Sequence, residues 1–529
     1  MLILSFKPGH DGALAAIEDG KLLFSLEAEK DSFPRFDRIT PELVALAARR
    51  LDKIPDVVAI SGWVKGWHSV ERPTEAGYFG RDEAKIATRE QNFMGKNVKV
   101  FSSTHERSHI MGAYGMSPIP KGQPAYCLVW EGNIGDFYEI DAEAKVHRIG
   151  RVLTDPGNKY SSLFMIGDPN FPKIKGHFRF EDAGKLMALA AYSDRAPLDA
   201  DEKKLIDYIL DSDGLLLGKS KDDYSWSKFY DIGVKSPEFK NLAGKFSDAV
   251  FERFHAFARQ HLTKKLPLVI SGGCGLNCDW NTNWVESQLF ESVFVPPCPN
   301  DSGSAIGTAI DAQLYYTGDP KISWSVYAGE EFVNDIEGVP DGFVAYPLNV
   351  DQVAKFLQSG HIIAWVQGRY EIGPRALGNR SILAAPFSNE TTVRLNRIKN
   401  REDYRPIAPI CLEEDAGHLF GRTTPSPHML YFNKVLTDSL RAVTHVDGSA
   451  RVQTVSNADN PEMYRLLKAF KQQTDFGVLC NTSLNFNGRG FINRTSDLRE
   501  YCVTRELDGF VVNDTFYVAG ALAERVPRS

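Results

Sequence analysis

Two stretches of the chain repeat one pattern, in which an apolar strand ends at a polar turn that contains glycine and two further strands follow. The first stretch begins MLILSF-KPGHDG-ALAAI and continues through Glu18-Asp19-Gly20 into KLLFSL. The second, AYCLVWEGNIGDFYEIDAEAKVHRIG, covers residues 125–150. Asp-Gly between two apolar runs favours a tight hairpin turn. The sequence therefore predicts a duplicated β-rich unit.

Strands alternate with helices further along the chain. Residues 266–284 and 294–316 each show an apolar strand, a turn that contains glycine and the start of a helix. This alternation predicts an α/β fold. A stretch rich in turn residues and without a long periodic pattern precedes residue 345. We therefore expect one domain over residues 1–345 and a second α/β domain over residues 346–529.

The composition excludes several classes of protein. The 529 residues carry a formal net charge of −7, whereas a dedicated nucleic-acid binder usually has a basic surplus. The seven cysteines form no C-x-x-C pair, which argues against a thiolate zinc site. The N-terminus lacks the basic start and long apolar run of a signal peptide, and no stretch has the length of a membrane span. We expect a cytoplasmic protein that binds neither membrane nor nucleic acid.

The segment STHERSHI places two histidines where they can act together. Ser103 and Glu106 have the spacing of a capping box, so a helix is expected to begin here. His105 and His109 are then one turn apart on one face and could hold a transition metal, or they could be two unrelated helical histidines. Asp301 is the best candidate for a third ligand. Such a set accommodates iron, manganese or zinc.

Gly-containing turns recur where strands end. SGGCGLN, residues 271–277, lies between a predicted strand and a helix, and its amides could hold a phosphate. It lacks the Gly-Lys-Ser/Thr ending of a P-loop, so a tight turn without a ligand is an equal alternative. GHDG at 9–12, GNIGD at 132–136 and NDSG at 300–303 are further turns of this kind. Ligands bind at such strand ends in α/β sheets.

The latter part of the chain carries a concentration of positive charge. Residues 369–405 contain eight Lys or Arg and four Asp or Glu. Arginine pairs with phosphate or carboxylate through two parallel hydrogen bonds, so this segment predicts an anion site. A solvated basic face is the alternative, and a nucleic-acid groove is disfavoured because aromatic residues are sparse. Arg451 and the polar loop around Asn481–Asn485 add further donors for a polyphosphate, although an ordinary surface turn would look the same.

Four of these segments, GPRALGNRSILA, IKNREDYRPIAP, HVDGSARVQTV and NTSLNFNGRG, together resemble the C-terminal domain of the carbamoyltransferase family. This family includes nodulation-factor and antibiotic O-carbamoyltransferases. GHDGALAAIEDGKLLFSLEAEK, THERSHI, GKLMALAAYS, SGGCGLN and PNDSGSAIGTA occur in the order that the family has. FKPGHDGA and SLEAEKDSFPR are most similar to the members that act on a 3-hydroxymethylcephem. A macrolide or sugar hydroxyl is the alternative acceptor.

The resemblance implies both a fold and an activity. Residues 1–345 would form an actin-like domain built of two ribonuclease-H-like halves, and residues 346–529 would form a YrdC-like domain. In the family, the YrdC-like domain joins carbamoyl phosphate and ATP into carbamoyl adenylate, for which we expect Mg²⁺ to assist. The N-terminal domain, with an iron ion, passes the carbamoyl group to an alcohol.

The resemblance also assigns roles to single residues. His105, His109 and Asp301 match the metal ligands, and His10 matches a histidine near the acceptor, where we expect it to act as a base. The cations of the adenylate-forming site are matched by Lys399, Arg405 and Arg451. Its phosphate and nucleotide contacts are matched by Arg375, Arg380, Ser483 and Asn485. The turn with Gly272, Gly273 and Asn277 would hold the adenylate phosphate.

One departure and two competing functions complete the sequence-based hypothesis. Many members have Asp-Gly where this chain has Glu131-Gly132, so the role of Glu131 as ligand or base is open. A tRNA threonylcarbamoyl-type transferase would share both folds, but the acidic balance counts against it. A nucleotide-dependent binding protein on the actin-like fold would leave the dense Arg, Asn and Ser chemistry of the second domain unexplained.

Overall fold

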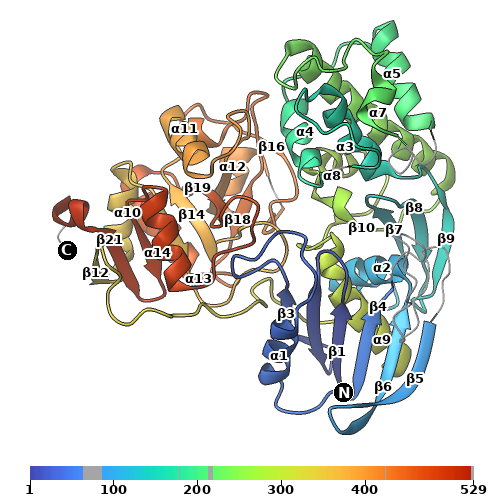
Figure 1. Ribbon diagram of the computed structural model, residues 1–529, viewed down its shortest axis with the longest axis horizontal. Coiled ribbons are helices and arrows are strands. Elements are labelled where there is room, and N and C mark those ends of the chain that lie inside the picture. The colour runs from blue at the N-terminus through green and yellow to red at the C-terminus, as the bar shows by residue number, and fades with distance from the viewer. Residues whose placement is uncertain (63–85, 178, 213–218, 423, 526–529) are drawn as a thin grey trace. The chain divides into compact units, whose positions relative to one another are not determined.

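The computed structural model describes the chain except for residues 63–85, 178, 213–218, 423 and 526–529 (Figure 1). The chain divides into two compact units. One consists of residues 1–108 and 301–529, and the other of residues 109–300. The expected domain boundary near residue 345 stays a prediction.

The first sheet of the larger unit begins with the predicted hairpins. Its strands have the order β3-β2-β1-β4-β6-β5, with β1, β2 and β3 antiparallel and β1, β4 and β6 parallel. Asp19 and Gly20 both have positive φ, as a tight turn between β2 and β3 requires. Helix α9 (Ser304–Thr317) packs on β1, β2 and β4. The strands are β1 (Leu2–Lys7), β2 (Ala13–Glu18), β3 (Lys21–Glu27), β4 (Val57–Ser61), β5 (Ile86–Phe93) and β6 (Lys96–Ser103), and α1 (Pro41–Arg50) lies between β3 and β4 in the chain.

The five-stranded sheet of the smaller unit has the same order as β3-β2-β1-β4-β6, read from the other edge. Its strands run β11-β10-β7-β8-β9, with β7, β8 and β9 antiparallel and β7, β10 and β11 parallel. The shared topology confirms the duplicated unit and the two ribonuclease-H-like halves. The strands are β7 (Ala125–Trp130), β8 (Gly135–Ile140), β9 (Val146–Arg151), β10 (Leu268–Ser271) and β11 (Val293–Phe294).

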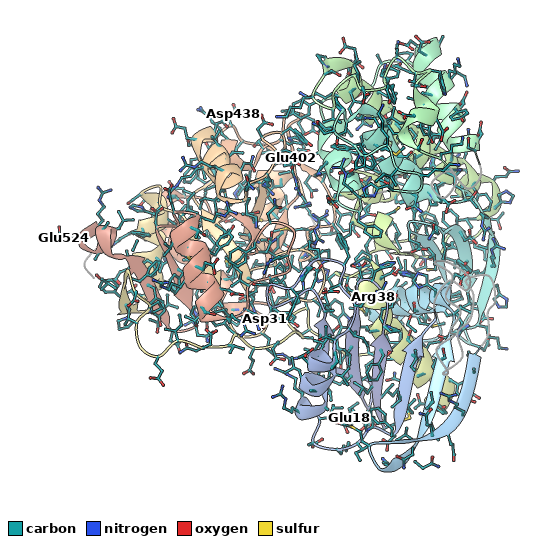
Figure 2. The ribbon with its side chains drawn as sticks, viewed as in Figure 1. Glu18, Asp31, Arg38, Glu402, Asp438 and Glu524 are labelled. Carbon is teal, nitrogen blue, oxygen red and sulfur yellow. The ribbon has the colours of Figure 1, made fainter. Side chains whose placement is uncertain are left out.

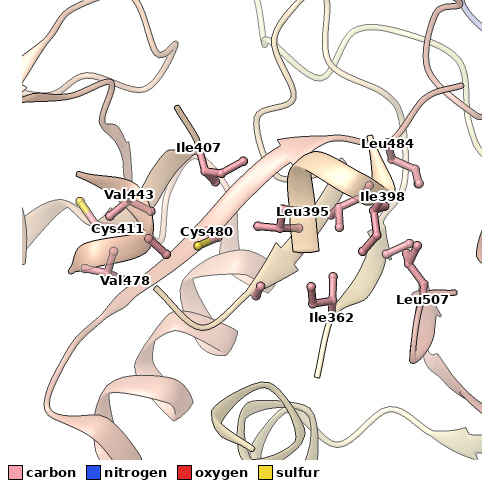
Figure 3. Close-up of a cluster of buried hydrophobic side chains, with 14 of the residues drawn as sticks. Ile362, Leu395, Ile398, Ile407, Cys411, Val443, Val478, Cys480, Leu484 and Leu507 are labelled. Carbon is pink, nitrogen blue, oxygen red and sulfur yellow. The ribbon is translucent and has the colours of Figure 1, made fainter. Parts of the chain in front are cut away.

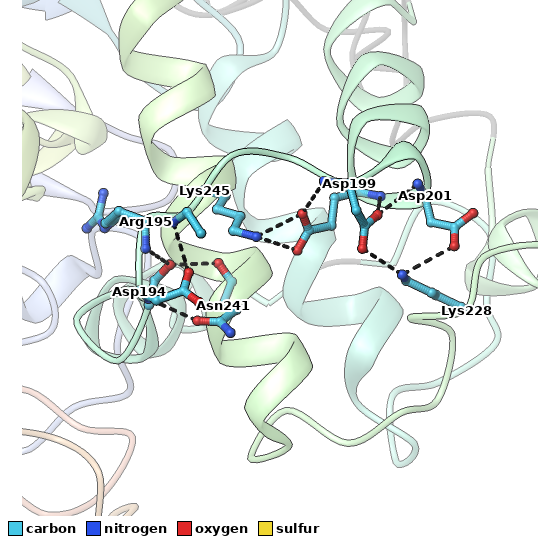
Figure 4. A network of polar contacts seen from close by, with 10 residues as sticks. Asp194, Arg195, Asp199, Asp201, Lys228, Asn241 and Lys245 are labelled. Atoms are coloured by element: carbon cyan, nitrogen blue, oxygen red, sulfur yellow. Dashed lines mark hydrogen bonds and ion pairs between the residues drawn. The ribbon is translucent and has the colours of Figure 1, made fainter.

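Helices of the smaller unit pack against this sheet and against one another. Trp130 at the end of β7 stacks on Trp280 of α8 with ring centroids 4.5 Å apart, in a fully buried core. A polar network ties α5 to α7, because Lys245 contacts both carboxylate oxygens of Glu202 at 2.8 and 2.9 Å (Figure 4). Asp199 caps α5 and also accepts from Lys228. The helices are α3 (Pro156–Gly167), α4 (Asp182–Ala190), α5 (Ala200–Asp211), α7 (Pro237–His261) and α8 (Cys278–Glu286).

A third sheet, in the larger unit, confirms the α/β character of the C-terminal part. Alternating side chains of β13 enter two cores, Ala364 and Val366 on one face and Ile363 and Trp365 on the other. Helices α11 and α14 cover the first face, which Figure 3 shows around Leu395, and α10 and α13 cover the second. The strand order is β12-β21-β20-β13-β14-β19-β15-β18.

The elements of this third layer have the following bounds. The strands are β12 (Phe343–Pro347), β13 (Ile363–Val366), β14 (Arg380–Ala384), β15 (Ala408–Leu412), β18 (Gln453–Val455), β19 (Val478–Ser483), β20 (Gly509–Val512) and β21 (Thr515–Ala519). The helices are α10 (Val350–Gln358), α11 (Asn389–Ile398), α12 (Ala416–Phe420), α13 (Pro461–Thr474) and α14 (Thr495–Thr504), and β16 (Asn433–Lys434) pairs with β17 (Ser449–Ala450). Among the helices of the described ranges, none combines the length and the apolarity that crossing a bilayer demands.

Candidate active site

The larger unit gathers two histidines and a lysine around Asp301. Lys7 ends β1, and its Nζ lies 3.2 Å from Asp301 Oδ2. His10, in the turn that follows, has its Nε2 3.7 Å from the same oxygen and its Nδ1 2.9 Å from Asp11 Oδ2. His105 Nε2 lies 3.7 Å from Asp301 Oδ1. Asp301 stands in the short turn before α9, so strand β1 and helix α9 together position this cluster.

Helix α2 (His105–Met116) carries both predicted metal-ligand histidines. Its first turn is capped by Thr104, whose Oγ1 accepts from the Arg107 amide at 3.3 Å, so Thr104 takes the place that the spacing had given to Ser103. The predicted capping box is therefore wrong by one residue, although the helix itself is confirmed. His105 and His109 are one turn apart on this helix, as predicted from their spacing, and both are buried.

The smaller unit places His109 beside a carboxylate and a hydroxyl. Its Nε2 lies 3.9 Å from Glu131 Oε2, and its Nδ1 lies 3.0 Å from Ser271 Oγ. Glu131 follows β7 and Ser271 ends β10, and these parallel neighbours end at the same sheet edge. A partner on one ring nitrogen fixes how the imidazole presents the other nitrogen, an arrangement common around bound metals. Each histidine of α2 thus has a carboxylate of its own unit next to it.

The predicted phosphate turn combines one constrained glycine with one open glycine. Gly272 has φ +96°, and a Cβ there would lie 2.3 Å from the Trp130 carbonyl oxygen, so only glycine fits. A Cβ on Gly273 would meet no described atom within 4 Å. Asn277 caps α8 by accepting from the Asp279 and Trp280 amides at 3.1 and 3.4 Å. The main chain at Gly273 therefore has room for a ligand, whereas the Asn277 oxygen is occupied by the helix.

In the C-terminal part, the structure brings Lys399, Ser483 and Asn485 together. Lys399 directly follows α11 and is buried, and its Nζ donates to Ser483 O at 2.5 Å and to Asn485 O and Oδ1 at 3.0 and 2.7 Å. Ser483 Oγ also donates to Asn485 Oδ1 at 2.6 Å. The segment after α11 and the loop after β19 are thereby joined at one ammonium group.

Several cations of this part act on one another. Burial, with the charges of Arg401 and Arg405, lowers the pKa of Lys399 well below that of an ordinary lysine. Burial, with Arg405 and Arg451, lowers the pKa of Arg401 to about 9. Burial also lowers the pKa of Arg405, where Glu402 opposes the effect and Arg451 adds to it. We call Lys399, Arg401, Arg405 and Arg451 the cation cluster. Its positive charge, which Glu402 compensates only in part, suits a polyanion.

Arg401 lies in the basic segment of residues 369–405, and no sequence pattern assigns it a role of its own. Its Nε donates to Asn396 Oδ1 at 2.6 Å, which fixes the turn after α11. Its position two residues after Lys399 is the sequence feature that marks it as a candidate for the same site. Arg451 Nε is buried and, within the described part of the chain, has no hydrogen-bond partner.

The hydrogen bonds of the Arg380 side chain are made within the fold. It is fully buried, and its guanidinium makes five hydrogen bonds, to Gln367, Gly368 and Asn379 carbonyl oxygens and twice to Asn493 Oδ1. These bonds use the donors that a nucleotide contact would need. Arg375 is half-buried in the loop that precedes Arg380. The roles of both arginines at a nucleotide stay predictions.

Comparison with known proteins matches both parts of the chain to one family. The model described as "Carbamoyltransferase N-terminus" matches residues 81–228 and 235–310, and the "Carbamoyltransferase C-terminus" model matches residues 354–518. The 3'-hydroxymethylcephem-O-carbamoyltransferase of Amycolatopsis lactamdurans is 53% identical over 98% of this chain and 99% of that protein, and the Streptomyces clavuligerus protein of the same name is 51% identical over 98% and 100%. Nodulation protein U of Rhizobium tropici is 32% identical over 100% and 98%. The chain therefore belongs to the carbamoyltransferase family of enzymes.

Proposed function

We propose that this enzyme makes carbamoyl adenylate from carbamoyl phosphate and ATP, and transfers the carbamoyl group to the hydroxyl of a 3-hydroxymethylcephem. The acceptor is the one named for the two 3'-hydroxymethylcephem-O-carbamoyltransferases that share more than half of their residues with this chain. The observation that carries the first step is the cation cluster, four buried or half-buried cations that Glu402 balances only in part.

The first step concerns two polyanionic substrates. Water releases phosphate from carbamoyl phosphate and leaves carbamate. A carbamate oxygen then attacks the α-phosphorus of ATP, the bond from that phosphorus to its bridging oxygen breaks, and pyrophosphate leaves. Arg401, Arg405 and Arg451 stabilise the charge on the phosphate oxygens, with Mg²⁺ on the triphosphate. Lys399 orients the Ser483–Asn485 loop through its three hydrogen bonds.

The second step transfers the carbamoyl group. The acceptor hydroxyl oxygen attacks the carbamoyl carbon, and its proton passes to His10 Nε2, whose ring Asp11 holds at 2.9 Å. The bond from the carbamoyl carbon to the phosphate oxygen breaks, and AMP leaves. The turn at Gly273 offers main-chain space for the phosphate of the adenylate.

A divalent metal ion belongs to this second step in our proposal. His105 and Asp301, and His109 with Glu131, supply imidazole and carboxylate donors, and the Ser271 hydroxyl on His109 Nδ1 fits a metal-bound imidazole. The family resemblance assigns the ion to His105, His109 and Asp301, and Glu131 is a further donor beside His109. A bound ion would supply Lewis acidity for the carbamoyl carbonyl. The donors suit iron, manganese or zinc, and the family resemblance favours iron.

Product analysis tests the proposal. The purified protein is incubated with ATP, Mg²⁺, Fe²⁺, carbamoyl phosphate and 3-hydroxymethylcephem, and the products are identified by mass spectrometry. We expect the carbamoylated cephem together with AMP and pyrophosphate. Carbamoylation without consumption of ATP would contradict the adenylate step. Reaction of a macrolide or sugar alcohol in place of the cephem would correct the acceptor, and retention of tRNA would favour the threonylcarbamoyl alternative.

A further inference from the structure

A short segment after β3 pairs with the loop that follows β19 in the same compact unit. Ser32 N donates to Phe491 O at 3.0 Å, Gly490 N donates to Phe33 O at 2.9 Å, and Arg35 N donates to Gly488 O at 3.0 Å. A Cβ on Gly490 would lie 2.0 Å from Glu29 O, so a glycine is required for this close approach. We call residues 29–36 the bridging segment. It joins the first sheet to the loop that carries Asn485.

Charged side chains fix the bridging segment in place. Arg494 forms two contacts with Asp31, one of them from Nε at 2.9 Å, and Asp31 is labelled in Figure 2. Lys30 is buried, and its Nζ donates to Gly373 O at 2.7 Å. Gly373 N in turn donates to Glu27 Oε1 at 2.6 Å. The N–H and the C=O of Gly373 are thus both hydrogen-bonded to side chains just before or within the bridging segment.

The partner loop of the bridging segment is the loop that holds Lys399. Asn485 accepts from Lys399 through Oδ1 and donates from Nδ2 to Arg489 O at 2.9 Å, and Arg489 opposes Pro34 in an antiparallel bridge. Arg35 follows Pro34 directly. After burial and the nearer arginines, the charge of Arg35 is a further cause that lowers the pKa of Lys399 and of Arg405. Arg35 therefore contributes to the same positive field as the cation cluster.

The Arg35 guanidinium makes one long contact with the Glu29 carboxylate and lies over the Phe36 ring, 4.9 Å from its centroid. Its Nε lies 3.4 Å from Glu29 Oε2, which is a long contact, and the side chain is 37% exposed. Among the described residues, this is the one hydrogen-bonding contact that its guanidinium makes. A purely structural arginine of this protein looks different, as the five hydrogen bonds of buried Arg380 show.

We propose that Arg35 is a phosphate-binding residue of the adenylate-forming site, supplied to it by the bridging segment. Its ligand is the polyphosphate of ATP or the pyrophosphate product. The bridging segment then adds a cation to the cation cluster, whose four members all lie beyond residue 398. The inference rests on the proposed function of the cation cluster, but it can be tested by binding alone.

The test measures binding of inorganic pyrophosphate with Mg²⁺ to the full-length protein by calorimetry at several salt concentrations. We expect Arg35→Gln to weaken binding about tenfold and to reduce the salt dependence, because one charge-assisted contact is lost. Arg35→Lys should recover part of the affinity. Arg38→Gln is the matched control, since Arg38 is an exposed arginine only three residues away (Figure 2), and it should bind as wild type does. Unchanged affinity of Arg35→Gln would overturn the proposal, as would an equal loss in Arg38→Gln.

The remaining outcomes separate this inference from the proposed function. Wild-type protein that binds pyrophosphate but releases none from ATP and carbamoyl phosphate would refute the reaction and leave the Arg35 contact supported. Wild-type protein that does not bind pyrophosphate would overturn both. If Arg35→Gln lowers the unfolding temperature, Arg35→Lys separates a loss of charge from a loss of stability, because it keeps the positive charge. Arg35→Lys must then recover affinity in a folded protein.

Discussion

Arg107 and Asp311 form a bidentate ion pair in the larger unit, with Nε–Oδ2 and Nη2–Oδ1 distances of 2.9 and 2.5 Å. Asp311 is fully buried. Arg107 lies two residues after His105 on α2. Asp311 lies on α9, the helix that begins directly after the turn that contains Asp301. The pair therefore fixes the two helices so that His105 faces Asp301.

Removal of this pair should destabilise the protein and disturb the proposed metal site. Arg107→Ala leaves the Asp311 carboxylate buried without its partner, which typically costs about 3–5 kcal/mol. We expect a fall of that size in the free energy of unfolding in urea, and a loss of bound metal in the folded fraction. Arg89→Ala removes an exposed arginine of β5 and serves as the control. Wild-type stability and metal content in Arg107→Ala would contradict this role.

The two histidines of α2 should be needed for one step only. His105→Ala is expected to spare the release of pyrophosphate from ATP and carbamoyl phosphate, because His105 lies outside the cation cluster. Formation of the carbamoylated alcohol should fall to background. Both steps are followed in one sample by pyrophosphate assay and mass spectrometry. Equal loss of both steps would mean that the histidine supports the fold instead.

The adjacent glycines of the phosphate turn should respond differently to alanine. Gly272→Ala places a Cβ against the Trp130 carbonyl at positive φ, so we expect a loss of stability of several kcal/mol, on the scale of other strained or overpacked sites. Gly273→Ala enters open space, so the fold should be retained while the ligand space is reduced. For this variant we expect normal pyrophosphate release and impaired transfer. A fully active Gly273→Ala enzyme would argue against a phosphate at this turn.

Binding of a polyanion to the cation cluster should take up protons at pH values around the depressed pKa of Lys399. The folded pKa of Lys399 is depressed, by burial first and by Arg401 and Arg405 next, so the free protein loses this proton at lower pH than an ordinary lysine does. Pyrophosphate favours the protonated form and raises the pKa again. Affinity should therefore fall as pH rises through the depressed pKa. Calorimetry in buffers of different ionisation enthalpy measures the uptake, which should be absent from Lys399→Met.

The same depressed pKa has a consequence for stability. At pH values below the folded pKa of Lys399, the folded and the unfolded chain both carry the Lys399 proton. The free-energy cost of burying this charge is then fully present. Between this folded pKa and the ordinary lysine value, the unfolded chain binds more protons, so the contribution of Lys399 to the free energy of unfolding rises with pH. Urea unfolding of wild type and Lys399→Met over this range measures the difference. A contribution that falls with pH would contradict the sign.

Patterns local in sequence allowed most of the fold to be predicted. Asp19-Gly20 specifies a hairpin because its backbone needs positive φ, and the apolar strand that ends at Glu131-Gly132 and is followed by two further strands indicates the second copy. The spacing of His105 and His109 defined one helix face. The cap was assigned to the wrong residue because Ser103 and Thr104 are both good caps, and only the backbone geometry chooses between them.

Side-chain roles that depend on distant partners were harder to predict. Asn277 and Arg380 have the chemistry of ligand contacts, yet a helix end occupies the Asn277 Oδ1 and a set of carbonyl oxygens accepts from the Arg380 guanidinium. No local pattern identifies Arg35, because its proposed role depends on the pairing of its segment with residues 488–491, more than 450 positions away. The Glu131 side chain is longer than the aspartate that many family members have at this position, so the sequence leaves its role as ligand or base open. The structure places its carboxylate beside His109.

Isotope exchange between labelled pyrophosphate and ATP, without any acceptor alcohol, tests the central claim most directly. The account predicts exchange that requires carbamoyl phosphate and Mg²⁺, that is abolished in Arg451→Ala, and that persists in Arg441→Ala, which removes an exposed arginine of the same region. Carbamoyl transfer to an alcohol by wild-type enzyme that shows no exchange, or wild-type exchange in Arg451→Ala, would contradict it.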